Sequence, residues 1–202
     1  MNSPPESDGE TVGHVHGRFQ PFHRGHLEYA AWAAGECDRL IVGLTNADPS
    51  HVRTENADPK RHEPRHNPFR YHERHRMIRA AVDGALAVPV RIMPFPINRP
   101  ELWDHYAPAD AVHFVNVLEE WHEVKADRLR EHGRTVRTKR GTRTVSGSEI
   151  RRAMANACAG DGTAEGRASG GADWTVDLPD GVAAVLRRID GPARARELYG
   201  AD

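Results

Sequence analysis

The segment that decides the fold is GRFQPFHRGH, residues 17–26, because it stands between a short apolar run and an amphipathic stretch. Residues 11–18 (TVGHVHGR) before it are typical of a strand. The residues after it, 26–36, predict a helix, because apolar side chains recur at helical spacing at Leu27, Ala30, Ala31 and Ala34. Residues 39–45 (RLIVGLT) then suit a buried parallel strand. A strand, a helix and a strand in this order predict an α/β sheet.

The same alternation continues along the chain. We expect helices over residues 71–82, 101–106, 118–130, 146–157, 179–189 and 193–198, and strands over residues 89–93, 111–117 and 135–137. The predicted fold is a Rossmann-like, doubly wound parallel sheet with C-terminal helices, and ligands bind such sheets at the C-terminal ends of the strands. The expected organisation is a disordered leader (1–10), a main domain (11–158), a Gly-rich linker (159–173) and a C-terminal helical segment (174–202).

Composition limits the possible partners. The formal net charge is −1, which argues against affinity for bulk nucleic acid or for a membrane surface. No apolar run approaches the roughly 20 residues that span a bilayer, and residues 1–10 do not resemble a signal peptide. The two cysteines, Cys37 and Cys158, have no metal-ligand spacing. We therefore expect a cytoplasmic protein with reduced thiols.

The segment 17–26 has the residue types of an anion-binding site. It lies at a predicted helix N-terminus, where unpaired backbone N–H groups and a partial positive charge attract phosphate. His23 and His26 can project imidazole N–H groups beside that terminus, and Gly25 lets a ligand approach where a Cβ would block it. The alternative is a pair of surface histidines next to a turn, and the helix-start context favours the anion site.

These residues resemble a known family. Residues 17–26 are similar to the GRFQPFHxGH signature of the archaeal-type nicotinamide mononucleotide adenylyltransferases, within the wider HxGH nucleotidyltransferase superfamily. Residues 67–69 (NPF), followed by Glu73 and Arg74, resemble the NPF…ER segment of that family, and Leu102-Trp103 resembles its LW. Residues 145–152 (VSGSEIRR) resemble its second signature. Both signatures in order on this strand–helix pattern indicate membership of the superfamily.

The resemblance implies that an acceptor phosphate or phosphonate attacks the α-phosphorus of a nucleoside triphosphate and releases pyrophosphate. Catalysis would rest on positioning and charge stabilisation, with Mg²⁺ bridging the triphosphate. It implies catalytic roles for His23, His26 and Arg151. The implied nucleotide-binding residues are Gly17, Arg18, Phe19, Gln20, Gly25, Ser146, Gly147 and Ser148. The implied acceptor-binding residues are Asn46, Arg74, Trp103 and Asn116.

Two segments depart from the family pattern and leave the substrates open. Residues 114–117 (FVNV) stand where the family has SGNP, and residues 45–48 (TNAD) stand where it has GSAQ. The first hypothesis is a CTP-dependent relative that acts on a small phosphonate, phosphonoformate, in antibiotic biosynthesis. The alternative is an adenylyltransferase that makes NAD from ATP and nicotinamide mononucleotide, which Trp103 favours if it stacks on nicotinamide. A second alternative is a non-catalytic nucleotide-binding module.

The insertion at residues 46–68 and the helix after it are rich in histidine. A zinc site is conceivable there because the spacings 62/66 and 72/75 are ligand-like, but no cysteine joins them among His51, His62, His66, His72 and His75. We assign no metal ligand and favour a lid or surface role. The expected partners are the nucleoside triphosphate and the acceptor, with no nucleic acid and no membrane, and a homo-oligomer is possible.

Overall fold

The computed structural model describes residues 9–48, 63–157 and 173–199. The chain forms two compact units, each built from separate stretches of sequence. The sheet unit consists of Met1–Gly17, Tyr29–Thr45 and Gly84–Thr142. The helical unit consists of Arg18–Glu28, Asn46–Asp83 and Arg143–Asp202. The domain boundaries expected from the sequence at residues 158 and 173 lie at or beside undescribed residues and stay predictions.

The sheet unit contains a five-stranded parallel sheet in the order β3-β2-β1-β4-β5. Its strands are β1 (Val12–Gly17), β2 (Arg39–Leu44), β3 (Val90–Pro94), β4 (Val112–Val117) and β5 (Thr135–Arg140). The order reverses between β1 and β4, which is the switch point where sheets of this kind bind ligands. The predicted doubly wound α/β fold is therefore confirmed.

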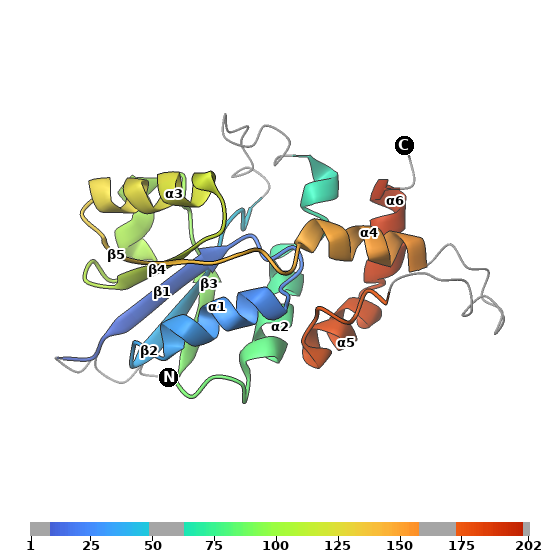
Figure 1. Ribbon diagram of the computed structural model, residues 1–202, viewed down its shortest axis with the longest axis horizontal. Helices are drawn as coiled ribbons and strands as arrows, with labels where there is room; N and C mark the ends of the chain where they lie inside the picture. The colour runs from blue at the N-terminus through green and yellow to red at the C-terminus, as the bar shows by residue number, and fades with distance from the viewer. Residues whose placement is uncertain (1–8, 49–62, 158–172, 200–202) are drawn as a thin grey trace. The chain divides into compact units, whose positions relative to one another are not determined.

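Helices cover both faces of this sheet (Figure 1). They are α1 (Arg24–Ala34), whose residues from Tyr29 onward belong to the sheet unit, and α3 (Glu120–Glu131). On one face Trp32 lies edge-on to Phe114 of β4, with ring centroids 5.1 Å apart. On the other face Ala126 and Leu129 of α3 pack in one buried cluster with Val115 and Val117 of the same strand. Alternate residues of β4 therefore face opposite layers, as the pleat of a strand requires.

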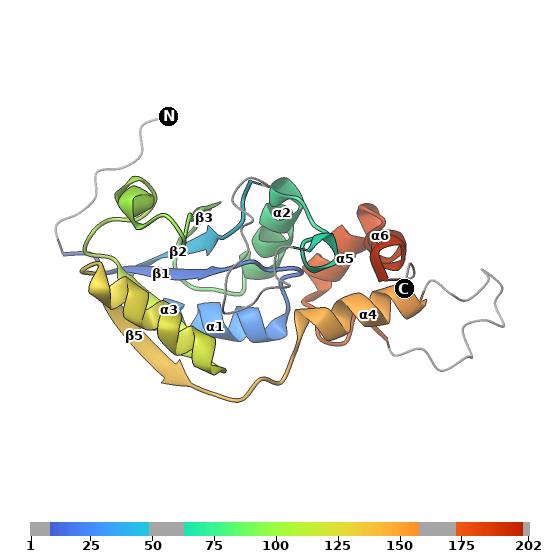
Figure 2. The same cartoon turned by 90° about the horizontal axis from the view of Figure 1, so that it is seen from above.

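The helical unit is formed by α2 (Tyr71–Val82), α4 (Gly147–Ala157), α5 (Asp180–Arg188) and α6 (Gly191–Tyr199), with the short η2 (Pro64–His66). Helix α2 packs against α5, and α4 packs against α6 (Figure 2). At the first of these contacts a Cβ on Gly181 would lie 2.5 Å from the carbonyl oxygen of Ala80, so glycine permits the close approach. Leu178, Val182 and Leu186 are buried. The C-terminal helices thus form part of the core of this unit.

Most expected elements occur within a few residues of their predicted bounds. Two features were not anticipated: η2 lies inside the expected polar insertion, and β5 extends to Arg140 rather than Arg137. The expected short helix at residues 101–106 is the 3-10 helix η3 (Pro100–His105). Among the described residues, no helix is both long enough and apolar enough to cross a bilayer.

Candidate active site

The signature segment at residues 18–26 is held in place by its own aromatic side chains. Phe19 and Phe22 are buried, and their ring centroids lie 5.2 Å apart. The Phe19 ring also meets the edge of the His26 ring at 4.9 Å. Phe19 has a φ of 53°, a left-handed conformation that is rare for a bulky residue. Such strain persists only where the surroundings impose it, and it clusters at functional sites.

His23 and His26 lie face to face at the start of α1, with ring centroids 3.6 Å apart. The backbone N–H of His23 donates to Nδ1 of His26 at 3.3 Å. Because that nitrogen accepts, a neutral His26 ring carries its proton on Nε2. Burial, together with the nearby positive charge of Arg143, lowers the pKa of His23 to about 4. His23 is therefore a neutral imidazole at physiological pH, and each ring can donate an N–H.

Gln20 joins the signature segment to residues 67–69. Its side-chain oxygen accepts from the Phe69 N–H at 2.9 Å, and its amide nitrogen donates to the Phe69 carbonyl at 3.0 Å. The side chain is 5% exposed. Both polar atoms of the Gln20 amide are thus hydrogen-bonded to the backbone of Phe69, so in this structure Gln20 holds the loop in place. A direct contact of Gln20 with a nucleotide stays a prediction.

Arg74 organises the same loop from α2. It is buried, and it donates to the carbonyl oxygens of Arg18 at 2.8 Å and Asn46 at 2.6 Å. Burial lowers the pKa of Arg74 to about 10, which leaves the guanidinium charged at neutral pH. The positive φ of Asn46, 51°, turns the chain where this carbonyl is held. The acceptor-binding roles of Arg74 and Asn46 stay predictions.

Arg151 of α4 is the centre of a buried network. Its guanidinium donates to the carbonyl oxygen of Gln20, to Ser148 Oγ at 3.0 Å and to the Tyr199 hydroxyl at 2.9 Å. Nδ1 of His66 lies 3.3 Å from the same guanidinium. Arg151 is 3% exposed. In this structure it therefore fixes the signature segment, and its predicted grip on the β- and γ-phosphates stays a prediction.

Two helix N-termini meet within the helical unit. A Cβ added to Gly147, the first residue of α4, would lie 3.1 Å from the Gln20 carbonyl oxygen. A Cβ on Gly25 of α1 would lie 3.4 Å from the His23 ring and 3.9 Å from the Val145 side chain. Ser146 precedes α4, and its carbonyl accepts from the Ile150 N–H at 3.1 Å. Helix N-termini attract phosphate, and here two of them lie beside two imidazoles. A polyphosphate site at this place stays a prediction.

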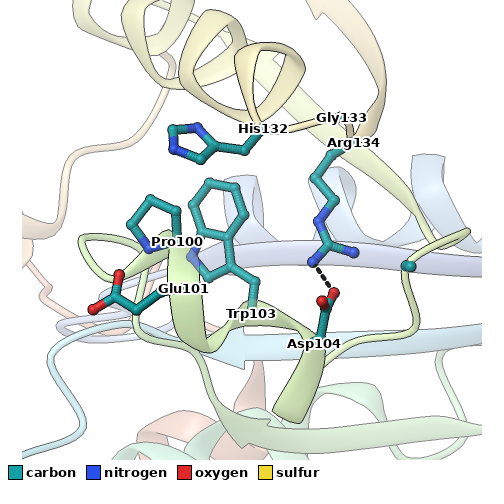
Figure 3. A pocket seen from close by; sticks show the side chains of 8 residues that line it. Pro100, Glu101, Trp103, Asp104, His132, Gly133 and Arg134 are labelled. Carbon is teal, nitrogen blue, oxygen red and sulfur yellow. Dashed lines mark hydrogen bonds and ion pairs between the residues drawn. The ribbon is translucent and has the colours of Figure 1, made fainter.

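The remaining acceptor-binding candidates, Trp103 and Asn116, belong to the sheet unit. Trp103 is 1% exposed, and its indole N–H donates to the Pro96 carbonyl at 3.0 Å. Its ring packs near His132 beside a hollow of about 490 Å³, where Arg134 is hydrogen-bonded to Asp104 (Figure 3). The packing shows a core residue in this conformation. Stacking of Trp103 on a ligand and binding of an acceptor by Asn116 stay predictions.

The sequence analysis missed the contribution of the C-terminal helices. Tyr199 of α6 supports Arg151, and Arg194 donates to Glu73 of α2 at 2.7 Å. The N–H and side chain of Arg24, inside the signature, donate to the carbonyls of Asp177 and Val176. No local pattern predicts these contacts, because the partners are 48 to 153 residues apart.

Comparisons with known proteins identify the family of the chain. Residues 15–153 match the family described as Cytidylyltransferase-like. The chain is 39% identical to the phosphonoformate cytidylyltransferase of Streptomyces viridochromogenes over 92% of this chain and 95% of that protein. It is 30% identical to the nicotinamide-nucleotide adenylyltransferase of Thermoplasma acidophilum, over 98% of this chain and 97% of that protein. The nicotinamide-nucleotide adenylyltransferase of Archaeoglobus fulgidus is 31% identical over 92% of this chain and 96% of that protein.

A solved structure shows the same fold. It is a bifunctional NMN adenylyltransferase/ADP ribose pyrophosphatase from Francisella tularensis, complexed with AMP and a manganese ion. The TM-score is 0.57 at 16% identity over 95% of this chain. The chain spans about half of that protein, 52% of its length. At this identity the likeness supports the fold alone.

Proposed function

The chain belongs to the cytidylyltransferase-like family and is a nucleotidyltransferase, and from this premise we propose that it transfers a cytidylyl group from CTP to a small phosphonate. The observation that carries the substrate choice is the higher identity to the phosphonoformate enzyme than to the two archaeal adenylyltransferases, over a similar share of the chain. The departures at residues 45–48 and 114–117 are compatible with an altered base and acceptor.

In the proposed reaction a phosphonate oxygen forms a bond to the α-phosphorus of CTP. The bond from that phosphorus to the oxygen bridging to the β-phosphorus breaks, and pyrophosphate leaves. The attacking oxygen is already anionic, so no general base is needed. Holding the two anions in line lowers the activation barrier, and proximity can supply roughly 7–11 kcal/mol of such a reduction. Each donor aimed at the developing charge adds about 3 kcal/mol.

The described contacts support a division of roles within the helical unit. His23, held neutral by burial, and His26, which stacks on it, donate N–H groups to the α- and β-phosphates. The N-terminus of α4 and the Gly25 N–H of α1 bind the rest of the triphosphate through backbone N–H groups. Gln20 and Arg151 hold the loop so that these donors are preorganised. Their contribution is positional rather than chemical.

We propose that Mg²⁺ enters with the triphosphate as part of the substrate. Mg²⁺ prefers oxygen ligands, and the described side chains that line the signature segment are imidazole, guanidinium and amide groups. The nearest acidic groups of the network are already paired: Glu73 with Arg194 at 2.7 Å and Glu63 with Arg65 at 2.6 Å. The donor set therefore suits binding of the phosphates of a magnesium–nucleotide complex, not a resident ion.

The test is pyrophosphate release from ATP, CTP, GTP and UTP with Mg²⁺, using phosphonoformate or nicotinamide mononucleotide as acceptor. The proposal expects turnover with CTP and phosphonoformate, and its loss by at least a hundredfold in His26→Ala. Turnover with ATP and nicotinamide mononucleotide alone would assign the chain to NAD synthesis instead. Nucleotide binding without pyrophosphate release from any pair would favour the non-catalytic module.

A further inference from the structure

Three histidines outside the proposed active site come together in the sheet unit. His14 and His16 occupy alternate positions of β1 and so face the same side of the sheet. His113 of β4 is the register partner of His14. The ring centroids lie 4.5 Å apart for His14 and His113, and 5.4 Å apart for His14 and His16. One ring nitrogen from each residue lies within 4.8 Å of the others.

This histidine cluster is buried and its polar atoms are unsatisfied. The three side chains are 0%, 2% and 0% exposed. Within the part of the chain that the structure describes, neither ring nitrogen of any of the three has a hydrogen-bond partner. Buried polar groups normally have partners, and an orphaned one costs free energy. Three at one point in an apolar layer beside Phe95 call for a ligand that can accept their lone pairs.

We propose that His14, His16 and His113 bind one divalent cation of the zinc class. Imidazole nitrogen is a preferred ligand of Zn²⁺, whereas Mg²⁺ and Ca²⁺ require oxygen. Zn–N distances of about 2.0–2.1 Å place tetrahedral ligand atoms about 3.3 Å apart, so small ring rotations close the site. Burial lowers the pKa of all three imidazoles, which keeps them in the neutral, ligating form.

The ion would tie β1 to β4 where the sheet has its shortest ladder. The register between these strands contains two residue pairs, against six between β1 and β2 and six between β4 and β5. The sheet also makes room for the cluster. A Cβ on Gly43 of β2 would lie 2.8 Å from Nε2 of His14, so glycine at this position permits the observed ring placement. The proposed role is structural cross-linking of the central strands.

Two positive groups face the cluster and shape its chemistry. Lys125 of α3, whose ammonium donates to the His16 carbonyl at 3.3 Å, lowers the pKa of all three histidines. Arg134 lowers the pKa of His14 and His113 and is paired with Asp104. These charges repel a bare cation, so the fourth ligand is a small anion such as hydroxide or chloride. Removing the Lys125 charge should therefore strengthen metal binding.

The test measures Zn²⁺ and Co²⁺ binding by the full-length chain without a histidine tag, after treatment with a chelator. The expected result is one ion per chain and the intense visible absorption of tetrahedral Co²⁺. His113→Asn should weaken zinc binding at least a hundredfold, whereas the same change at the exposed His105 should leave it unaltered. Lys125→Met should tighten it several-fold. Unsaturable binding by the wild type, or unchanged affinity in His113→Asn, overturns the proposal.

The wild type alone gives a second, independent test should His113→Asn fail to fold. X-ray absorption of the zinc-loaded chain should show a first shell with three imidazoles. A shell with one imidazole or none, or one dominated by sulfur, refutes the site. Because neither measurement uses turnover, the result is separate from the fate of the proposed cytidylyl transfer.

Discussion

Replacement of Tyr199 by phenylalanine tests whether the C-terminal helix supports the active-site loop. The change removes the hydroxyl that accepts from Arg151 Nε at 2.9 Å and donates to the Arg65 carbonyl at 3.3 Å. Arg151 is 3% exposed, so water cannot easily replace the lost partner. A hydrogen bond to a buried charged group contributes about 1.5–3 kcal/mol. We expect the free energy of unfolding to fall by that amount.

The measurement is urea unfolding followed by circular dichroism, with the melting temperature as a second readout. For a chain of this size the loss corresponds to roughly 3–12 °C. If the disturbance reaches the Gln20 carbonyl, kcat/KM falls about tenfold as well, because 1.4 kcal/mol is a factor of ten. Tyr106→Phe, the same change in the sheet unit, serves as the control. A Tyr199→Phe protein with both stability and kcat/KM like the wild type would refute the assigned role of α6.

Four further substitutions separate roles in and around the signature segment. Gly25→Ala should leave the melting temperature unchanged, since its Cβ meets protein atoms no closer than 3.4 Å, but it should lower pyrophosphate release at least tenfold. Gly147→Ala should lower both pyrophosphate release and the melting temperature, because its Cβ would lie 3.1 Å from the Gln20 carbonyl oxygen. Equal melting temperatures of the two variants would contradict this reasoning. Gln20→Leu leaves the Phe69 N–H and carbonyl without their buried partner and should lower the free energy of unfolding, measured in urea titrations, by about 2–4 kcal/mol. A loss below about 0.5 kcal/mol would show that the two hydrogen bonds between Gln20 and Phe69 are dispensable. His23 binds its proton at about pH 4 when folded, against an ordinary value near 6.5, so the unfolded state is protonated first and stability falls as pH drops through that window. Relative to His23→Gln, the wild type should lose up to about 3 kcal/mol between pH 6.5 and 4, and parallel stability curves would count against a buried neutral imidazole.

The elements of the fold were predictable where one local pattern determined them. The apolar run at residues 39–45 and the spacing of Leu27, Ala30 and Ala34 indicated β2 and α1, and the structure confirms both. The helix expected over residues 146–157 is likewise found, as α4 from Gly147 to Ala157. Periodicity reports which side of an element is buried, and that information is sufficient to define strands and helices.

Side-chain partners far apart in the sequence could not be predicted in this way. The hydrogen bonds between the Gln20 side chain and the Phe69 backbone join residues 49 apart, and no local spacing distinguishes a glutamine that binds phosphate from one that binds backbone. The pairing of His14 with His113 depends on β1 and β4 being neighbours, which follows only from the strand order. A signal was present, since histidines at alternate positions of a buried strand place polar groups in an apolar layer.

The polar residues of the signature and its neighbours divide into two kinds, and the division explains how the loop can be strained and still well placed. Gln20, Arg74 and Arg151 direct their side chains at backbone carbonyls and amides, from three separate stretches of the chain. These contacts over-determine the conformation in which Phe19 has its positive φ. In the proposed reaction, His23, His26 and the two helix N-termini then stabilise the charge, and they require no reorganisation when the triphosphate arrives. Substitutions of the first group should therefore affect stability and turnover together, whereas His26→Ala should affect turnover far more than stability.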